Sequence, residues 1–582
     1  MLKTIFSQVK EYKTASILTP IFMIGEVILE MMLPLLMASI IDDGVEKGDL
    51  GHIYMVGAIM VVVAILSLIT GVLGGKYGAR ASTGFAKNLR KAMYDNIQTF
   101  SFANIDKFST AGLVTRLTTD VSNMQMAYQM LLRMCMRAPA SLIVAMVMAF
   151  SINAKLASVY LVAVFLLGIV IFFIATRAMK YFNQVFKKYD DLNASVQENI
   201  IGMRVVKAFV REDYETEKFK SASGNVYKMF VNAERIVSFN APIMNLTVYS
   251  CIMAISWIGA KMIVAGDMQT GDLMSLLTYC MNILMSLMML SMIFVMVTMS
   301  MASARRIAEV LEEQADIVNP DNPIYEVLDG SIEFKNVAFQ YHSGSEGKVL
   351  EDINLSIKSG ETIGIIGGTG SSKSSLVNLI SRLYDVTEGE LLVGGVNVRD
   401  YDIETLRNEV AVVLQKNVLF SGSVFDNLRW GNKDATEEEC MHACKLACAD
   451  EFIQKMPEKY NTHIEQGGAN VSGGQKQRLC IARALLKKPK ILILDDSTSA
   501  VDTATDAKIR HAFATEIPDT TKLIIAQRIS SVQHADRIIV MEDGRIDGIG
   551  SHDELLETNA IYRDVYESQI GGNADFDEKG GE

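Results

Sequence analysis

Six long apolar runs fill the first 301 residues of this chain, and they constrain its fold more than any other feature. A helix needs about 20 predominantly apolar residues to cross the hydrocarbon core of a bilayer, and most of the runs approach or exceed that length. The runs cover residues 16–41, 53–75, 137–152, 157–176, 241–264 and 273–301. The sequence therefore predicts an all-α membrane domain of six transmembrane helices, with both of its ends on the same side.

Basic residues indicate which side that is. Lysine and arginine gather after the second and fourth runs, at Lys76, Arg80, Lys87, Arg90, Lys91, Arg177, Lys180, Lys187 and Lys188. The first loop, residues 42–46, reads Asp-Asp-Gly-Val-Glu instead. Because cytoplasmic loops carry the excess of lysine and arginine, we expect a multi-pass protein of the cell membrane with both termini in the cytoplasm. The two basic connections are long and keep a helical apolar period, so they are predicted to be helices that project well beyond the bilayer.

Residues 1–15 precede the first run and have the pattern of an amphipathic helix. Leu2, Ile5, Phe6, Val9 and Tyr12 share one helical face, with lysines opposite them. Such a helix lies in the membrane interface, and we expect one here, leading into a transmembrane domain of residues 16–313. The first run is too long for the core of a signal peptide and is followed by five more, so it is predicted to remain as a membrane anchor.

Two acidic residues lie within the first run. Glu26 and Glu30 are one helical turn apart, near the depth where a carboxylate is costly in lipid. They could face a cavity, where they would attract cationic substrates or carry a proton, or they could pair with polar groups of neighbouring helices and hold the bundle together. In the last run, Met281, Met285, Met288, Met292, Met296 and Met299 recur at helical spacing. Flexible thioethers suit a surface that repacks around varied ligands, but lipid contact or plain packing explains the same spacing.

The composition changes after residue 301, where charged residues and short strands bounded by glycine replace the apolar runs. Residues 314–329 contain paired prolines among polar residues and are predicted to be a linker. Residues 330–568 alternate strands and helices and are predicted to form an α/β domain. Residues 569–582 are acidic and glycine-bearing, so we expect a disordered tail. The net charge of -12 argues against nucleic acid as a partner, because binding phosphate backbones needs a basic surface.

An apolar strand in the α/β part, residues 362–366, runs directly into a phosphate-binding loop. The loop comprises Gly367, Gly368, Thr369, Gly370, Ser371, Ser372, Lys373, Ser374 and Ser375. Its glycines let backbone N–H groups turn toward phosphate oxygens, Lys373 reaches the outer phosphates, and the Ser374 hydroxyl can ligate Mg²⁺ at a helix N-terminus. The sequence therefore predicts a P-loop NTPase domain that binds ATP.

Two further segments complete the pattern. A buried strand at residues 490–494 ends in Asp495 and Asp496, and Asp495 stands where a carboxylate can hold the Mg²⁺ ion. Between this strand and the phosphate loop, Ser472, Gly473, Gly474 and Gln475 open a predicted helix, which makes a second anion site.

This set of motifs, in this order and spacing, resembles the ABC transporters, in the exporter class that fuses six membrane helices and one ATPase domain in a chain. The resemblance covers almost the whole chain. It implies that Tyr341 stacks on adenine, that Gln415 lies between the ATPase and membrane domains and contacts Mg²⁺, and that residues 472–475 close over ATP bound to a partner subunit. It also assigns Ser499 and Asp502 to a loop that crosses the dimer interface. Residues 113–123 and 208–215 would be the coupling segments that touch the ATPase domains.

Three positions depart from that family. Asp496 stands where a glutamate usually follows the metal-binding aspartate, and its shorter carboxylate should reach the attacking water poorly. Gln527 stands at the switch histidine, where it can hydrogen-bond the γ-phosphate but cannot carry positive charge toward it. Ser372 replaces a glycine, which costs about 1 kcal/mol if its φ is positive. ATP binding should persist, because Lys373, Ser374 and Asp495 remain.

The signature at residues 472–475, by contrast, is whole. The resemblance then implies the degenerate-site subunit of a bacterial heterodimeric multidrug-type exporter, whose partner subunit carries the glutamate and histidine. This chain's own site would hold ATP, while its signature completes the partner's catalytic site. The expected function is ATP-driven export of amphipathic or drug-like molecules by alternating access. A lipid or peptide exporter, or a nucleotide-gated regulatory membrane subunit without hydrolysis-driven transport, remains an alternative.

Overall fold

The computed structural model describes residues 1–341, 347–496 and 501–577, which form two compact units. Unit 1 comprises Met1–Gln98 and Thr110–Glu313, and unit 2 comprises Thr99–Ser109 together with the chain from Gln314 onward. Each unit is described separately below.

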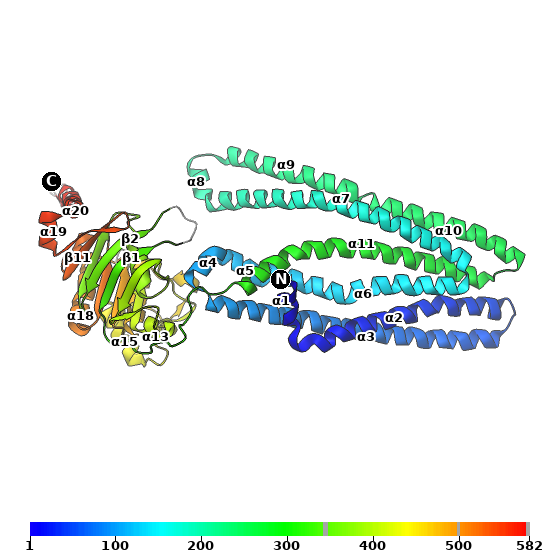
Figure 1. The fold of residues 1–582 in the computed structure, drawn as a ribbon, viewed down its shortest axis with the longest axis horizontal. Helices are drawn as coiled ribbons and strands as arrows, with labels where there is room; N and C mark the ends of the chain where they lie inside the picture. The colour runs from blue at the N-terminus through cyan, green and yellow to red at the C-terminus, as the bar shows by residue number, and fades with distance from the viewer. Residues whose placement is uncertain (342–346, 497–500, 578–582) are drawn as a thin grey trace. The chain divides into compact units, whose positions relative to one another are not determined.

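Long helices build unit 1 (Figure 1). They are α2 (Lys13–Ser39), α3 (Leu50–Thr99), α6 (Val121–Ile152), α7 (Ala154–Ile201), α10 (Asn240–Ala265) and α11 (Thr270–Glu312). Shorter segments are α1 (Leu2–Phe6), η1 (Ser7–Tyr12), η2 (Ile40–Val45), α5 (Thr110–Thr115), η3 (Arg116–Asp120), α8 (Met203–Ala208) and α9 (Glu212–Val237). Among the described residues, 6 helical stretches are long and apolar enough to cross a membrane, which confirms the predicted six-helix membrane domain.

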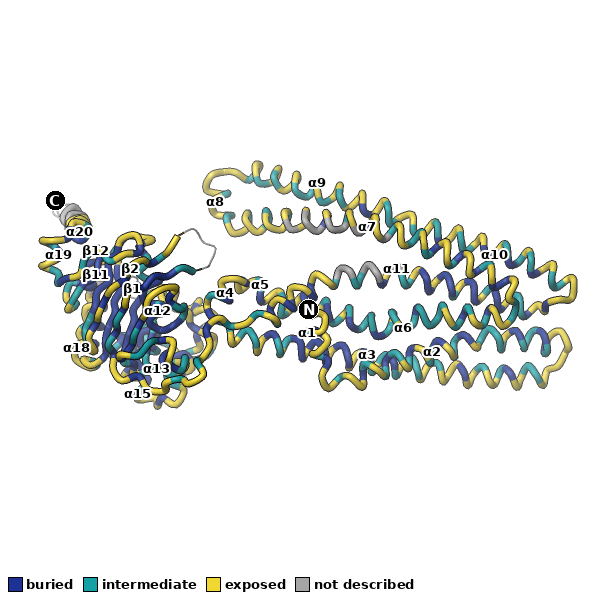
Figure 2. The backbone as a smooth tube through the Cα atoms, viewed as in Figure 1, coloured by how far each residue is buried: buried dark blue, intermediate teal, exposed yellow. Residues whose placement is uncertain are grey.

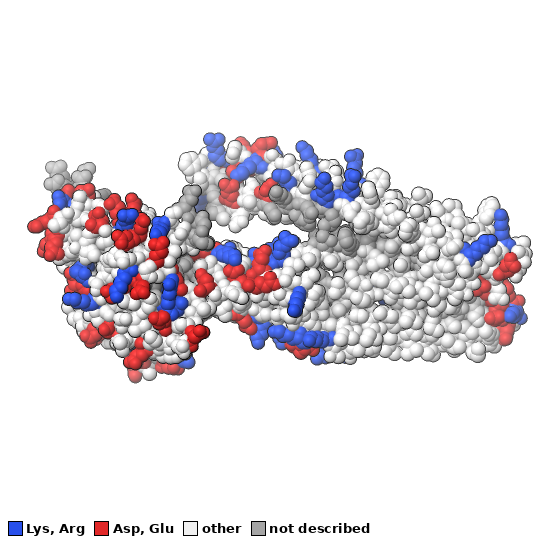
Figure 3. Space-filling model, viewed as in Figure 1, with Lys and Arg blue, Asp and Glu red and all other residues white. Residues whose placement is uncertain are grey.

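The surface of unit 1 agrees with a membrane location. Figure 3 shows a broad band without charge across these helices, with charged side chains gathered on either side of it. Large apolar side chains on these helices are exposed, among them Leu68 of α3, Phe165 of α7 and Trp257 of α10. In water such an exposed apolar area would be costly, whereas lipid tails cover it without cost.

In the interior of unit 1, tyrosine hydroxyls donate hydrogen bonds to backbone carbonyls of neighbouring helices. Tyr160 of α7 donates to the carbonyl of Leu276 in α11 at 2.6 Å, and Tyr279 of α11 donates to the carbonyl of Met31 in α2 at 2.6 Å. Both tyrosines are buried. Away from water these hydrogen bonds have no competing partner, so they fix how the helices pack against one another.

The N-terminal segment is broken rather than a single amphipathic helix. Lys10 has φ = 40°, which puts a kink inside η1. Ile5 and Val9 are buried within unit 1, and the ring of Tyr12 occupies the space where a side chain on Gly84 would otherwise lie. Much of the apolar face predicted for the membrane interface is therefore used to pack this segment onto the helices of its own unit.

Two sheets build most of unit 2 (Figure 1). The larger one has the strand order β12-β11-β3-β10-β9-β6, and its neighbouring strands are parallel except for the antiparallel edge strand β12. Its strands are β3 (Thr362–Gly367), β6 (Val410–Val413), β9 (Ile491–Asp495), β10 (Thr521–Ile525), β11 (Arg537–Glu542) and β12 (Arg545–Gly550). The smaller sheet is antiparallel and contains β1 (Ile332–Phe339), β2 (Leu350–Ile357), β4 (Glu388–Val393) and β5 (Val396–Asn397). Together with the helices, these sheets confirm the predicted α/β domain.

Helices surround the sheets, and Figure 2 shows the strands as the most buried part of the unit. The helices are α4 (Phe102–Phe108), α12 (Lys373–Ile380), α13 (Ile403–Glu409), α14 (Val424–Leu428), α15 (Glu437–Leu446), α16 (Asp450–Ile453), α17 (Gly473–Leu485), α18 (Thr503–Glu516), α19 (His552–Thr558) and α20 (Ala560–Asp577). Short pieces are β7 (Gly422–Ser423), β8 (His463–Ile464), η4 (Lys459–Asn461), η5 (Gln466–Gly468) and η6 (Ile529–Ser531).

The structure bears on two further expectations. Residues 569–582 were predicted to be a disordered tail; the structure describes residues up to Asp577 as part of α20, and the Gln569 side chain hydrogen-bonds to the turn after β10. The first coupling segment was expected at residues 113–123, which belong to unit 1, whereas α4 belongs to unit 2, so the coupling role stays a prediction. The hydroxyl of Tyr384 donates to Asp106 of α4 at 2.7 Å. Residues 113–123 instead pack within unit 1 against α11.

Candidate functional site

The parallel sheet brings the predicted nucleotide motifs to one edge. Strands β3, β10, β9 and β6 are adjacent and parallel, so their carboxyl ends lie at the same side of the sheet. The phosphate loop follows β3, Gln527 follows β10, Asp496 follows β9, and Gln415 follows β6. The carboxyl edge of a parallel sheet is where α/β proteins bind ligands, so residues from four distant parts of the sequence can act on one molecule.

The phosphate loop turns tightly between β3 and α12. A side chain on Gly367 would collide with the carbonyl oxygen of Met541 on the neighbouring strand, and Gly370 has φ = 89°. Ser372 has φ = 68°. The angle is therefore positive, which is the condition under which the sequence analysis expected a cost at this position. A residue with a side chain pays about 1 kcal/mol for this conformation, so the loop carries strain that a glycine would not.

Lys373 is folded into the loop that it belongs to. Its ammonium donates to the carbonyls of Gly367 and Gly368 at 2.8 and 2.7 Å and to the hydroxyl of Ser371 at 3.1 Å. Burial lowers the pKa of Lys373, and the nearby Asp495 and Asp496 carboxylates partly oppose that shift. The loop therefore concentrates a positive charge among neutral oxygen atoms, where a phosphate group would be a stronger partner than a carbonyl.

A hydroxyl and a carboxylate meet where the Mg²⁺ ion was predicted. The Ser374 hydroxyl donates to Oδ1 of Asp495 at 3.0 Å, and burial raises the pKa of Asp495. Hard oxygen atoms of this kind suit Mg²⁺, which keeps most of its coordination for phosphate and water. Among the described residues, no group of three or more histidine, cysteine or acidic side chains is arranged to hold a metal ion.

Asp496 and Gln527, two of the residues predicted to depart from the family pattern, contact each other. Nε2 of Gln527 donates to Oδ2 of Asp496 at 2.8 Å, and the side chain of Gln415 also hydrogen-bonds to that carboxylate. Burial raises the pKa of Asp496, whereas these two amides lower it. The Asp496 backbone has φ = 46°, and its N–H donates to the carbonyl of Ile525 at 3.0 Å. The short carboxylate is thus engaged by two amide side chains, and the backbone that carries it is fixed by its bond to Ile525.

Gln569 supports the candidate ATP site, and the sequence analysis did not identify it. Its side chain donates to the carbonyl of Gln527 at 2.8 Å and accepts from the N–H of Ile529 at 2.9 Å. Both bonds brace the turn that carries Gln527. No local sequence signal marks this role, because it depends on α20 folding back onto β10.

Tyr341 lies beside the phosphate loop, as a base-stacking residue must. Its hydroxyl is 2.8 Å from the hydroxyl of Ser375, and its ring meets Tyr384 and Phe339 edge to face at 5.0 and 4.7 Å. These contacts fix the direction of the ring. The role in adenine binding stays a prediction.

The signature residues form an ordered helix start. Ser472 caps α17: its hydroxyl accepts from the N–H of Gln475 at 3.3 Å, while the Gln475 side chain accepts from the N–H of Ser472 at 2.9 Å. Asp502 caps α18 in a similar way by accepting from the N–H of Thr505 at 3.0 Å. Ser499 lies outside the described residues. The exposed N-terminus of α17 can meet a phosphate from another molecule.

In unit 1 the two membrane glutamates share one arginine. Arg137 of α6 contacts Glu26 at 2.8 Å and Glu30 at 2.7 Å. The second carboxylate oxygen of Glu26 is buried without a hydrogen-bond partner. Glu26 and Glu30 therefore pair with a polar group of a neighbouring helix, which is the second of the two interpretations given by the sequence. If all three groups are charged, the cluster carries a net charge of one negative unit. On the methionine face, Met281, Met285 and Met292 are exposed, and the side chain of Met299 lies outside the described residues.

Comparisons with known proteins agree with these features. Residues 16–288 match the family described as ABC transporter transmembrane region, and residues 350–499 match the family described as ABC transporter. The chain is 38% identical to the uncharacterized ABC transporter ATP-binding protein YfiB of Bacillus subtilis, covering 97% of this chain and 98% of that protein. It is 36% identical to the uncharacterized ABC transporter ATP-binding protein Rv1273c of Mycobacterium tuberculosis, covering 98% of each. A solved bacterial Atm1-family ABC exporter with ATP bound has the same fold, with a TM-score of 0.82 at 22% identity over 96% of this chain and 99% of that one.

Proposed function

We propose a specific role for this chain within the ABC transporter family, to which it belongs as an exporter with fused transmembrane and ATPase domains. It is the subunit of a heterodimeric exporter whose own ATP site binds nucleotide but hydrolyses it slowly. Its intact signature, residues 472–475, completes the catalytic site of the partner subunit. The observation that carries this proposal is the Asp496–Gln527 contact of 2.8 Å, set against the well-formed helix start at Ser472.

In this chain's own ATP site, the groups needed for hydrolysis are altered, whereas the groups needed for phosphate binding are retained. A general base must reach the water that attacks the γ-phosphate, and Asp496 is short and already hydrogen-bonded to two amides. Gln527 offers a neutral donor where a histidine could bring positive charge to the transition state. By contrast, the groups that only bind phosphate, Lys373 and Ser374, are in place. Retention of ATP without turnover follows from losing the hydrolytic groups alone.

Mg²⁺ would be held by Ser374, Asp495 and Gln415 together with phosphate oxygens, and would neutralise charge on the phosphates when bound. Lys373 leaves its carbonyl partners for the phosphates, and Tyr341 orients the adenine. Ser472 and Gly473 present backbone N–H groups to the γ-phosphate in the partner's site. Binding at both sites draws the ATPase domains together, and this closure drives the membrane helices between their inward and outward states.

We assign the protein to the cell membrane with both termini and the ATPase domain in the cytoplasm. Its substrates are amphipathic or drug-like molecules that reach the protein from within the lipid. Because Glu26 and Glu30 carry one more negative charge than Arg137 can balance, cations are favoured among such molecules. A lipid or peptide substrate remains a second candidate, supported by the exposed methionine face of α11.

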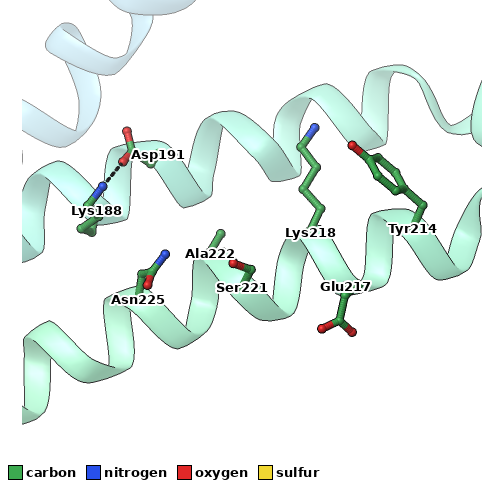
Figure 4. Close-up of a pocket in the computed structure, with 8 residues that line it drawn as sticks. All are labelled: Lys188, Asp191, Tyr214, Glu217, Lys218, Ser221, Ala222 and Asn225. Carbon is green, nitrogen blue, oxygen red and sulfur yellow. Dashed lines mark hydrogen bonds and ion pairs between the residues drawn. The ribbon is translucent and has the colours of Figure 1, made fainter.

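The α7–α9 hairpin offers a surface for the second subunit. At its tip, Phe209 is 73% exposed and Val210 is 80% exposed, outside the apolar stretches that span the membrane. Between the two helices is a hollow of about 450 Å³, lined from α7 by Lys188 and Asp191, which pair at 3.0 Å, and from α9 by residues such as Tyr214 (Figure 4). Exposed aromatic and apolar side chains in water mark a protein interface, and the partner half-transporter is the occupant that we assign to it.

A test compares the chain alone with the assembled pair in liposomes. The account predicts slow ATP hydrolysis by the purified chain and fast, substrate-stimulated hydrolysis once the partner subunit is added. Fast turnover by the chain alone would overturn the heterodimer proposal. The main alternative, a nucleotide-gated regulatory subunit, predicts substrate movement on ATP binding with no hydrolysis in either preparation, which phosphate release and substrate uptake measured together distinguish.

A further inference from the structure

Unit 2 contains a second cavity that shares no residue with the ATP motifs. It has a volume of about 480 Å³ and lies between α18, β10 and the segment that follows β10. Its basic side chains and apolar walls come from Arg510, His511, Phe513, Lys522, Ile524 and His534. Cavities of about 300–1,000 Å³ with apolar walls and a few polar groups are typical of small-molecule sites.

Lys522 gives this cavity its charge. The residue is 4% exposed, and its ammonium donates to the carbonyl of Thr520 at 2.8 Å and to that of Pro518 at 3.5 Å. Neither partner is charged, and none of the carboxylates that the structure describes forms an ion pair with Lys522. Asp536 and Asp519 attract it only from a distance, and burial lowers the pKa of the ammonium. A buried cation that lacks a contacting anion is costly, and an anionic ligand would remove that cost.

The remaining lining does not cancel this charge. No aspartate or glutamate lines the cavity among the residues that the structure describes. Arg510 is balanced by Asp506 at 3.2 Å, but a guanidinium has five N–H donors and can also face a ligand. The imidazoles of His511 and His534 stand at the exposed rim. The ionisable side chains that line the cavity are therefore basic.

Hydrogen bonds within the protein itself connect the two elements, α18 and η6, that form walls of the cavity. Arg510 donates to the carbonyl of Ser530 at 2.8 Å, and the Ser531 hydroxyl donates to Asp506 at 3.0 Å. These two bonds join α18 to η6 across the cavity, so the site is preformed and a ligand would pay little to order it. Phe513 and Ile524 are buried and form its apolar floor.

We propose that this cavity binds a small organic oxyanion. The carboxylate or phosphate of the ligand contacts Lys522 and Arg510, and an apolar group of the ligand packs on Phe513 and Ile524. This assignment does not depend on the heterodimer proposal, because it uses none of the ATP-site or signature residues. The ligand would contact α18, which begins after Asp502, and η6, which follows Gln527, so it lies beside two elements that adjoin ATP motifs in the chain.

Photolabelling of the full-length protein in lipid nanodiscs tests this proposal. The probe is 4-azidobenzoate, followed by peptide mapping. The account predicts saturable labelling of residues 507–514 or 530–535. Excess benzoate competes with the probe, and neutral benzyl alcohol does not. Phenyl phosphate and inorganic phosphate are compared as competitors, because stronger competition by benzoate identifies a carboxylate ligand and stronger competition by phenyl phosphate identifies a phosphate ester. Competition by inorganic phosphate equal to that of phenyl phosphate would contradict the role of the apolar floor.

Two variants locate the charge that matters. Lys522→Met keeps the length of the side chain but removes a charge-assisted contact, so half-maximal labelling should need about tenfold more probe. Lys508→Met, which removes an exposed lysine of α18 that does not line the cavity, is the matched control and should leave labelling unchanged. His511→Ala, at the exposed rim, should weaken labelling a few-fold and serves if Lys522→Met does not fold. Labelling that maps elsewhere, or that is equally strong after the loss of Lys522 or of His511, would overturn the proposal.

Discussion

Replacing Asp496 and Gln527 with the residues that are usual in the family should make this chain's own site hydrolyse ATP. Asp496→Glu moves the carboxylate outward from its own backbone by about one C–C bond, about 1.5 Å. Gln527→His replaces the amide that now contacts Asp496 at 2.8 Å with a group that can carry charge toward the γ-phosphate.

The size of the effect follows from what a general base contributes. Positioned proton transfer is worth about 10²–10⁴-fold in rate. We expect the double variant to raise turnover at this site about 100-fold, and each single variant about tenfold, because Gln415 continues to hold the lengthened carboxylate. Phosphate release is measured in liposomes with a pair whose partner carries glutamine at its catalytic glutamate, so that only this chain's site can turn over.

A matched control uses the same chemical change elsewhere. Asp543 is also an aspartate with positive φ, 44°, but it stands in the exposed turn between β11 and β12. Asp543→Glu should leave turnover unchanged. If the double variant still binds ATP and stays at the background rate, the slow site is not explained by these two side chains.

Three further outcomes follow. Ser372→Gly should relieve the positive φ of the phosphate loop, stabilise the protein by about 1 kcal/mol and tighten ATP binding a few-fold, whereas Asn336→Gly, which relaxes φ = 47° outside the site, should not change ATP affinity. Burial raises the pKa of Asp495, so the folded protein holds a proton there more tightly than the unfolded chain, and the charged form costs stability above the folded pKa. Asp495→Asn should therefore raise the melting temperature of the nucleotide-free protein at neutral pH, and the gain should shrink as the pH falls toward the unfolded pKa of about 4; a gain that grows on acidification would contradict the sign. Arg137→Met should destabilise the membrane unit by about 3 kcal/mol in nanodiscs, and neutralising both of its glutamate partners as well should recover most of the loss.

Local patterns in the sequence predicted the elements that carry the ATP site. The apolar strand before Gly367 and the one before Asp495 have the length and composition of central parallel strands, and parallel strands place their carboxyl ends together. The positive φ of Ser372 was likewise foreseeable, because a position usually held by glycine is often one that needs that angle.

Contacts between distant segments could not be predicted in the same way. Gln569 braces Gln527 only because α20 returns to the sheet, and its acidic, glycine-bearing surroundings favoured disorder. The sharing of Arg137 between Glu26 and Glu30 depends on the rotation of two helices about their axes, which apolar runs leave undetermined. The apolar face of residues 1–15 did not distinguish lipid from protein as its partner, and Ile5 and Val9 pack against protein.

The central claim is a division of labour between two sites, and the most direct test is to disable each site of the assembled pair in turn. The measurement is steady-state phosphate release from liposomes after the partner's catalytic glutamate is changed to glutamine, compared with release after Asp496→Asn in this chain. The account predicts that the partner's change reduces turnover at least about 100-fold more than the change at Asp496. Equal losses from the two changes, or full turnover after the partner's change, would contradict it.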